Sequence, residues 1–285
     1  MSDFVQQQNS ICDFATSDSW VILSPIEQSI KKKIEAVGTP LKDWDINIYR
    51  GVLTGCNEAF IIDSQKRDEI LANCQTEDER KRTAELIRPI LRGRDIKRYG
   101  YVDNGLYLIN THNGVRGRIP RIKIEDYPAV KAHLDQYWDR IATRADKGDT
   151  PYNLRNCAYL EDFFKPKITW GNLNLEGTYS YAPEGMFINA PSPFIATTNI
   201  AILHILNSTI ADYYIRSLGV TRNGGYFEYK PMFVEKLPVP KTGLDKLMSY
   251  PTQPSQKQKQ EMAAIIYQLY GLSQQEIDYL ENREL

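Results

Sequence analysis

The sequence predicts an α+β fold, in which a mixed sheet packs with helices and an amphipathic helical segment follows. Three observations lead to this class. Hydrophobic residues make up 42% and charged residues 25% of the 285 residues, which is close to the globular average and allows a substantial core. Apolar residues recur at helical spacing in segments such as 25–36 and 255–270. Short apolar runs bounded by turn residues predict strands.

The first helices are predicted from periodicity and from capping residues. Residues 25–36 carry three isoleucines at i, i+4 and i+8 spacing, which places them on one helix face. Thr76 and Glu79 form a capping box, so a second helix begins there. Pro89 cannot continue a helix, so the second helix is expected to run to Arg88.

The central part of the chain is expected to alternate helices with short strands. Strands are predicted at 59–62, 106–109 and 165–170. Asp126 is expected to cap a helix that has a proline in its first turn. One continuous helix is predicted over residues 199–218, with Gly219 just beyond its end.

The last segment of the chain is predicted to form two helices after a proline-containing linker. The first covers residues 255–270, and its apolar face consists of Met262, Ile265, Ile266 and Leu269. Ser273 and Glu276 form a capping box for the second helix. The sequence contains no internal repeat.

Positive charge is concentrated in one part of the chain. The formal net charge is −1, yet residues 80–123 hold twelve Lys/Arg and three Asp/Glu, an excess of nine that leaves −10 for the remainder. Such a distribution is typical of a protein with one surface that faces an anionic partner. Within this sector, the segment 91–99 carries four cationic residues, and Leu91 and Ile96 are expected to anchor it in the core as a scaffold element.

Several classes of protein are not indicated. Residues 1–19 are polar and acidic, so they are expected to be a leader or linker rather than a signal peptide. No apolar run approaches the roughly 20 residues that span a bilayer, so a cytoplasmic protein is expected. Neither a zinc site nor a disulfide framework is predicted, because no C-x-x-C pair occurs among Cys12, Cys56, Cys74 and Cys157.

Catalytic motifs are scarce. No H-E-x-x-H, G-x-S-x-G or nucleotide-binding glycine pattern occurs, and the histidines are limited to His112, His133 and His204. Two of the three, His133 and His204, fall on predicted helices beside apolar residues and are expected in the core. The run 189–194 (N-A-P-S-P-F) resembles the Asn-Pro-Pro-aromatic motif of amino-methyltransferases. Its prolines do not adjoin the asparagine, so that geometry fails.

One short pattern leaves an enzymatic alternative open. Asp95 and Lys97 match the D-x-K half of a nuclease site, in which a carboxylate holds a metal and the lysine steadies a water. No upstream Pro-Asp partner appears. A salt bridge from Asp95 to Arg94 or Arg98 is the simpler role. Accordingly, no catalytic residue, no metal ligand and no bound cofactor is expected in this chain.

The remaining chemistry is that of DNA binding. Arginine reads guanine, Asn and Gln read adenine, and Lys or Arg neutralises phosphate. Side chains of these types, together with aromatic residues, occupy loops and strand entries. The candidates for base contacts are Arg116, Arg118, Arg121, Lys165, Lys167, Trp170, Arg222, Asn223 and Tyr226. The candidates for phosphate contacts are Arg92, Arg94, Lys97, Arg98 and Lys230.

A series of motifs in one order carries a family resemblance. The motifs are G-V-L-T-G-C-N-E-A-F (51–60), I-L-R-G-R-D-I-K-R-Y (90–99), R-A-D-K-G (144–148), Y-N-L-R (152–155), K-P-K-I (165–168), I-L-N-S (205–208), G-G-Y-F-E-Y (224–229), E-K-L-P-V-P (235–240) and L-Y-G-L-S (269–273). Over about residues 20–285 the chain resembles the TaqI-like C-terminal specificity domain. That domain belongs to fused restriction-modification enzymes and related phage-defence methyltransferases.

The resemblance implies a target-recognition domain over residues 20–245 that reads a short DNA sequence in the major groove. It also implies that residues 246–285 are spacer-type helices that hold this domain against a catalytic part. S-adenosylmethionine and Mg are expected only in that methyltransferase or nuclease part. Because segment 91–99 belongs to the shared pattern, its cations are expected to form salt bridges or sequence-blind phosphate contacts. Besides the nuclease, a protein-interaction module acting through the C-terminal helices is an alternative.

Overall fold

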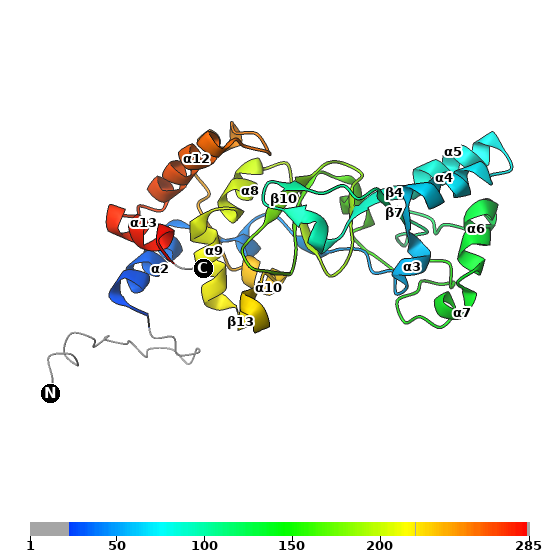
Figure 1. Ribbon diagram of the computed structural model, residues 1–285, viewed down its shortest axis with the longest axis horizontal. Helices are drawn as coiled ribbons and strands as arrows, with labels where there is room; N and C mark the ends of the chain where they lie inside the picture. Colours follow the sequence, from blue (N-terminus) through cyan, green and yellow to red (C-terminus); the bar gives the residue numbers. More distant parts are fainter. Residues whose placement is uncertain (1–22, 220, 284–285) are drawn as a thin grey trace.

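The computed structural model describes residues 23–219 and 221–283. The described part is elongated, with helices gathered at both ends and short strands between them (Figure 1). The leader predicted for residues 1–19 lies outside the described residues. Two hydrophobic clusters form the core, one toward each end.

Two four-stranded sheets occupy the middle of the molecule. The first is antiparallel and has the order β10 (Tyr179–Ala182), β8 (Lys167–Trp170), β12 (Pro193–Ala196) and β2 (Ile48–Arg50). The second has the order β11 (Phe187–Ile188), β4 (Ile87–Leu91), β7 (Leu106–Ile109) and β3 (Ile61–Asp63). Because β11 runs parallel to β4 and the other pairs are antiparallel, this sheet is mixed, as predicted.

Three smaller sheets join segments that are distant in the sequence. They comprise β13 (Thr221–Arg222) with β14 (Tyr226–Glu228) and β9 (Leu173–Asn174); β1 (Thr39–Pro40) with β15 (Pro238–Val239); and β5 (Ile96–Lys97) with β6 (Gly100–Tyr101). The β9–β14 pairing brings the loop after β8 against the loop after α9 (Thr209–Leu218). That juxtaposition builds one surface from two loops that are distant in the sequence.

Helices complete the two ends. One end holds α3 (Asn57–Phe60), α4 (Ser64–Ala72), α5 (Glu77–Leu86), α6 (Pro128–Asp135) and α7 (Trp138–Ile141) (Figure 1). Toward the other end lie α2 (Pro25–Val37), α8 (Ile200–Leu206), α9, α10 (Pro231–Val234), α11 (Asp245–Met248), α12 (Gln256–Leu269) and α13 (Gln274–Glu281). The α+β class predicted from the sequence is therefore confirmed.

Local sequence signals place most helix ends correctly. The predicted helix at 25–36 is α2, which begins after a Ser24–Glu27 capping box and buries Ile30 and Ile34. The strand predicted at 106–109 is β7. The Ser273 side chain caps α13 as predicted, and the matching box at Ser255 opens α12.

Three predicted boundaries are wrong. The apolar run at 59–62 divides between α3 and β3 instead of forming one strand. Helix α5 ends at Leu86, and Pro89 lies within β4. Asp126 does not cap α6, whose N-cap is Tyr127 without a side-chain hydrogen bond.

The long helix predicted over residues 199–218 is two helices, because polar side chains interrupt it. Asn207 ends α8 and turns its amide onto the backbone of Tyr179, accepting from N at 3.0 Å and donating to O at 2.9 Å. The Ser208 hydroxyl then accepts from the N–H of Ala211 and begins α9. The apolar stripe continues across this break, which is why periodicity alone does not reveal it.

The apolar face of the C-terminal helices is buried within the chain itself. Met262 is 1% exposed and Ile266 is 2% exposed, in the same cluster as residues of α2, α8 and α9. Glu276 on α13 accepts hydrogen bonds from Ser29 and Lys33 on α2, each at 2.7 Å. Residues 246–283 therefore share a core with residues 25–43 and 199–245. Met262 and Ile266 are not free to bind a partner, whereas Ile265 and Leu269 are only partly buried.

Candidate nucleic-acid interface

The segment 91–99 is anchored as predicted, with Leu91 2% and Ile96 3% exposed. Arg92 forms a bidentate pair with Asp95, with Nε 2.8 Å from Oδ2 and Nη2 3.0 Å from Oδ1. Arg98 donates to Glu176 Oε2 at 3.1 Å and to the carbonyl oxygen of Gly177. These two arginines are therefore internal braces of the scaffold.

Arg94 and Lys97 are exposed, and unlike Arg92 and Arg98 neither forms an ion pair with a carboxylate among the described residues. Lys97 Nζ donates to the carbonyl oxygen of Arg94 at 3.1 Å and is in no carboxylate pair among the described residues. Cations with this freedom are suited to phosphate, which requires charge and reach but no fixed orientation.

The geometry does not favour a nuclease at Asp95 and Lys97. Asp95 is 5% exposed, and besides Arg92 it accepts from Asn104 Nδ2 at 2.9 Å. Burial alone would raise the pKa of Asp95, but hydrogen bonds from the Arg92 side chain and backbone hold that pKa below its usual range. Both carboxylate oxygens are thus engaged by protein groups.

The candidate residues Arg116, Arg118 and Arg121 follow one another in a loop after β7, but they differ in their partners. Arg118 Nη1 lies 2.8 Å from Glu161 Oε2, and Arg121 Nη1 lies 3.1 Å from Asp149 Oδ2. Arg116 is exposed and in no ion pair within the described part of the chain. Exposed pairs of this kind are weak, so these arginines could be drawn to phosphate or bases at small cost.

Two predicted base contacts are contradicted by burial. Lys167 is fully buried in β8, where Nζ donates to the carbonyl oxygens of Phe163 and Met186, both at 2.9 Å. Trp170 is also fully buried, and its Nε1 donates to Tyr229 O at 2.6 Å. Both side chains stabilise the core and do not reach DNA.

Lys165, just before β8, remains at the surface. It ion-pairs with Asp162 at 2.7 Å, and its side chain is 61% exposed. The strand that begins after it is buried along its length, so the candidate contacts of this region reduce to Lys165 alone.

The hairpin formed by β13 and β14 is the most exposed of the predicted recognition segments. Gly224 and Gly225 have φ angles of 79° and 78°, a backbone conformation that glycine tolerates best, and they form the turn. Asn223 is exposed in this turn, and Arg222 and Tyr226, paired across the two strands beside it, are exposed as well, Tyr226 by 41%. The hairpin therefore presents three side chains that can read base edges or stack.

A single carboxylate organises the base of this hairpin. Glu228 Oε1 lies 2.5 Å from Arg222 Nη2, and its Oε2 lies 2.9 Å from Lys230 Nζ. Lys230 and Arg222 together hold the pKa of Glu228 below its usual range. A groove runs beside these residues, lined by Asn172, Leu173, Pro191, Thr221, Arg222, Asn223, Glu228 and Lys230.

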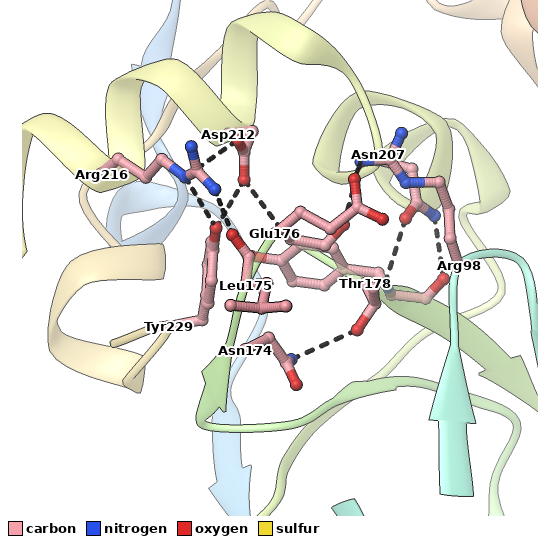
Figure 2. A network of polar contacts seen from close by, with 11 residues as sticks. Arg98, Asn174, Leu175, Glu176, Thr178, Asn207, Asp212, Arg216 and Tyr229 are labelled. Atoms are coloured by element: carbon pink, nitrogen blue, oxygen red, sulfur yellow. Dashed lines mark hydrogen bonds and ion pairs between the residues drawn. The ribbon is translucent and has the colours of Figure 1, made fainter. Parts of the chain in front are cut away.

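A buried polar network fixes the loop beside the hairpin (Figure 2). Asp212 Oδ1 on α9 accepts from the N–H of Gly177 at 2.8 Å and from the Tyr229 hydroxyl at 2.6 Å. Arg216 lies 3.1 Å from Asp212 Oδ2, and it donates to the carbonyl oxygen of Leu175. The loop is consequently held on α9 by charge-assisted bonds, which preorganise the surface that it forms with the hairpin.

Sequence reasoning missed several residues of this surface. Leu173 and Leu175 are 49% and 55% exposed, and Asn172 lies in the groove beside them. The alternation in Gly171–Leu175 (G-N-L-N-L) was the available signal, but alone it reads as an ordinary half-buried strand. Only the pairing with β14 brings it next to Arg222.

The described residues contain no sign of a metal centre or membrane span. Within 23–219 and 221–283, no three His, Cys, Asp or Glu side chains are grouped as metal ligands. No helix there is long and apolar enough to cross a membrane. Cys56, Cys74 and Cys157 are free thiols.

A family model identifies the class of protein to which the chain belongs. The family model for the TaqI-like C-terminal specificity domain matches residues 88–239, just over half of the chain. The chain belongs to this family, which confirms the resemblance seen in its motifs. No curated protein matches the sequence.

Solved structures of restriction enzymes share the fold. The type IIL restriction-modification enzyme MmeI, solved in complex with DNA, is 13% identical to this chain in sequence, and the two structures superpose with a TM-score of 0.56. The match covers 85% of this chain and 35% of the MmeI chain. The type IIG restriction endonuclease BpuSI is also 13% identical to this chain, with a TM-score of 0.50. That match covers 87% of this chain and 28% of the BpuSI chain. The chain thus spans about a third of the length of these enzymes.

Proposed function

We propose that this chain recognises a short sequence in duplex DNA and directs a restriction-modification activity, an adenine methyltransferase or endonuclease, that resides elsewhere in the protein or complex. The observation that carries the proposal is the β13–β14 hairpin. It presents Arg222, Asn223 and Tyr226 from a fixed base, and arginine and asparagine are the side chains that read guanine and adenine bidentately.

The phosphate contacts are assigned to Arg94, Lys97, Arg116 and Lys230. The first three are exposed and in no ion pair within the described residues, whereas Lys230, at the edge of the hairpin, is paired with Glu228. Their role is to position the domain on the duplex without regard to sequence. In this account the chain itself is not catalytic, and S-adenosylmethionine and Mg belong to the catalytic part. Working with that part on DNA, and in phage defence, the protein would act in the cytoplasm.

The C-terminal helices are proposed to contact the catalytic part through their outward side. Their inner stripe is buried, but a groove between α12 and α13 is lined by Ala263, Ala264, Leu272, Ile277 and polar residues at its rim. Deleting residues 250–285 would expose the core, so surface variants are the better probe. Ala264→Glu should weaken co-purification with a catalytic subunit without lowering Tm, whereas unchanged co-purification would contradict this contact.

Salt-dependent DNA binding tests the proposed function. The affinity for a labelled duplex, measured by fluorescence anisotropy, should fall steeply as salt rises, because phosphate contacts release counterions. A log–log slope of roughly −4 corresponds to four or five phosphate contacts. Binding that stays undetectable at low salt, even with a catalytic partner added, would contradict the proposal.

A further inference from the structure

Strand β9 and the residue after it expose apolar side chains and turn polar ones toward the protein. Leu173 and Leu175 are 49% and 55% exposed, whereas Asn172 and Asn174 are partly buried. A strand at a protein surface normally has the opposite arrangement, because burial removes apolar side chains from water. A shift of one residue in register would turn both leucines inward, so specific contacts must hold the strand as it is.

Hydrogen bonds of the two asparagines provide those contacts. Asn172 Nδ2 donates to the carbonyl oxygen of Pro191 at 2.9 Å. Asn174 Nδ2 donates to Thr178 Oγ1 at 3.2 Å (Figure 2). Both asparagine side chains are thus engaged by the protein, and the leucines between and after them are held outward by the fold.

The outward face of β9 continues the face that carries Arg222. In the β9–β14 ladder Leu173 lies opposite Glu228, and in the β13–β14 ladder Arg222 lies opposite Tyr226. Residues that are opposite across antiparallel strands, or two apart along one strand, share a face of the sheet. These four side chains therefore lie on one face of the three-stranded sheet, and three of them, Leu173, Arg222 and Glu228, line the same groove.

Glu228 separates an apolar part of this face from a cationic part. Strand β14 runs between β13, which carries Arg222, and β9, which carries Leu173. The two carboxylate oxygens of Glu228 hold Arg222 and Lys230, at 2.5 and 2.9 Å. A ligand that fits this face must therefore offer an apolar group beside hydrogen-bond acceptors and negative charge.

The major groove of duplex DNA presents this combination. Among the four bases, only thymine carries an apolar group at its groove edge, the 5-methyl group. Guanine N7 and O6 accept from arginine, and phosphate oxygens supply the negative charge. Opposite residues of two strands have Cβ atoms about 5 Å apart, and successive bases rise by about 3.4 Å. Because the Arg222 guanidinium reaches Glu228, which is opposite Leu173, the two side chains would contact bases about one or two steps apart.

We propose that Leu173 contacts the 5-methyl group of a thymine within about two base pairs of the base that Arg222 contacts, and so makes the hairpin surface selective for thymine. This inference rests on the proposed function, and it adds a base to the recognised sequence and the residue that selects it. A leucine offers no hydrogen bond, so the selectivity comes from burying the methyl group, which cytosine and uracil lack. Burial of one methyl-sized group corresponds to an affinity change of about fourfold.

Replacement of thymine by deoxyuridine tests this contact, because deoxyuridine pairs as thymine does but lacks the methyl group. The full chain, with its catalytic partner if binding requires it, is first used to select a target from random duplexes. Each thymine of either strand is then replaced singly, and affinity is measured by fluorescence anisotropy. One replacement, within about two base pairs of the position that Arg222→Ala relaxes, should weaken binding about fourfold.

Variants of Leu173 assign the effect to this side chain. Leu173→Ala should bind the thymine and deoxyuridine duplexes equally at that position, whereas Leu173→Met, which keeps an apolar side chain, should retain the preference. Met248→Ala is the control, because Met248 is an apolar residue of α11 that is 42% exposed and does not line the groove. Since Leu173 is 49% exposed, its replacement by alanine should leave Tm unchanged.

Failure of this inference is distinct from failure of DNA recognition. A selected target without thymine near the position relaxed by Arg222→Ala would overturn the methyl contact while sequence recognition stands. Equal affinity for all deoxyuridine duplexes, or a preference that persists in Leu173→Ala, would do the same. If no target is selected at all, the proposed function falls and the methyl contact falls with it.

Discussion

The guanidinium of Arg222 is held by the carboxylate of Glu228, with Nε 2.6 Å and Nη2 2.5 Å from the same oxygen, Oε1. The other oxygen of Glu228 holds Lys230. A cationic side chain that a carboxylate already orients loses less conformational entropy when it binds a base. The Arg222–Glu228 pair therefore favours sequence-specific contacts over non-specific attraction to phosphate. The hairpin would therefore act as a preorganised reader.

Replacing Glu228 by Gln should reduce specificity while strengthening non-specific binding. The change removes a negative charge and frees Arg222 and Lys230 for phosphate. The preference for the target over an unrelated duplex should fall by roughly 1–3 kcal/mol, the usual worth of a bidentate base contact. Competition binding measures this ratio, with Glu261→Gln on α12 as the control. A ratio equal to that of wild type would mean that Glu228 does not orient the reader.

Neighbouring arginines of segment 91–99 should behave differently when replaced by alanine. Arg94→Ala should weaken binding to all duplexes alike and reduce the salt slope by about 1, as expected for a phosphate contact. Arg92→Ala should instead destabilise the fold by roughly 2 kcal/mol, because it leaves the buried carboxylate of Asp95 without its partner. Anisotropy and urea unfolding separate the two effects. Identical behaviour of the variants would refute the division of roles.

Lys167→Met should change stability but not sequence preference. Burial lowers the pKa of Lys167 to about 8, from 10.5 in an unfolded chain. Between these pH values the unfolded chain holds more protons, so the Lys167 side chain makes the protein more stable as pH rises. Relative to Lys167→Met, the wild-type free energy of unfolding should increase by roughly 3 kcal/mol across this window. If the unfolding free energies of wild type and Lys167→Met changed in parallel with pH, or if the variant preferred another DNA sequence, Lys167 would not be a buried core residue.

Capping and strand signals could be predicted from the sequence because they act within a few residues. Ser255 and Ser273 cap their helices through partners three residues away, and 106–109 forms a strand as its composition indicates. The contacts of Glu79 could not be predicted from neighbouring residues alone. Its carboxylate accepts from the N–H groups of Gln75 and Ala129, and the second lies 50 residues further along the chain.

The candidate interface could be predicted only in part, for the same reason. Arg222 and Asn223 lie exposed in a glycine turn, which composition indicates. Lys167 resembles them in type, and only the carbonyl groups of Phe163 and Met186 reveal that it is internal.

Acid should weaken the contact between α13 and α2. Burial would raise the pKa of Glu276, but hydrogen bonds from Lys33, Ser273 and Ser29 bring that pKa down to about 2. A depressed carboxyl pKa contributes stability above about 4.5, the unfolded value, and loses it as pH falls toward 2. Glu276→Gln should therefore lose roughly 2 kcal/mol at neutral pH, after allowance for the partial exposure of Lys33, and little in acid. Unfolding curves at both pH values measure the difference, which would vanish if the contact were absent.

Selection of binding sites from random duplexes tests whether the β13–β14 hairpin reads sequence. The wild-type chain, with its catalytic partner if required, should enrich one short consensus. Arg222→Ala should enrich a consensus relaxed at one position, with a loss of roughly 1–3 kcal/mol there, whereas Lys97→Ala should enrich the wild-type consensus with lower yield. An identical consensus for Arg222→Ala, or no enrichment by the wild-type chain, would contradict the account.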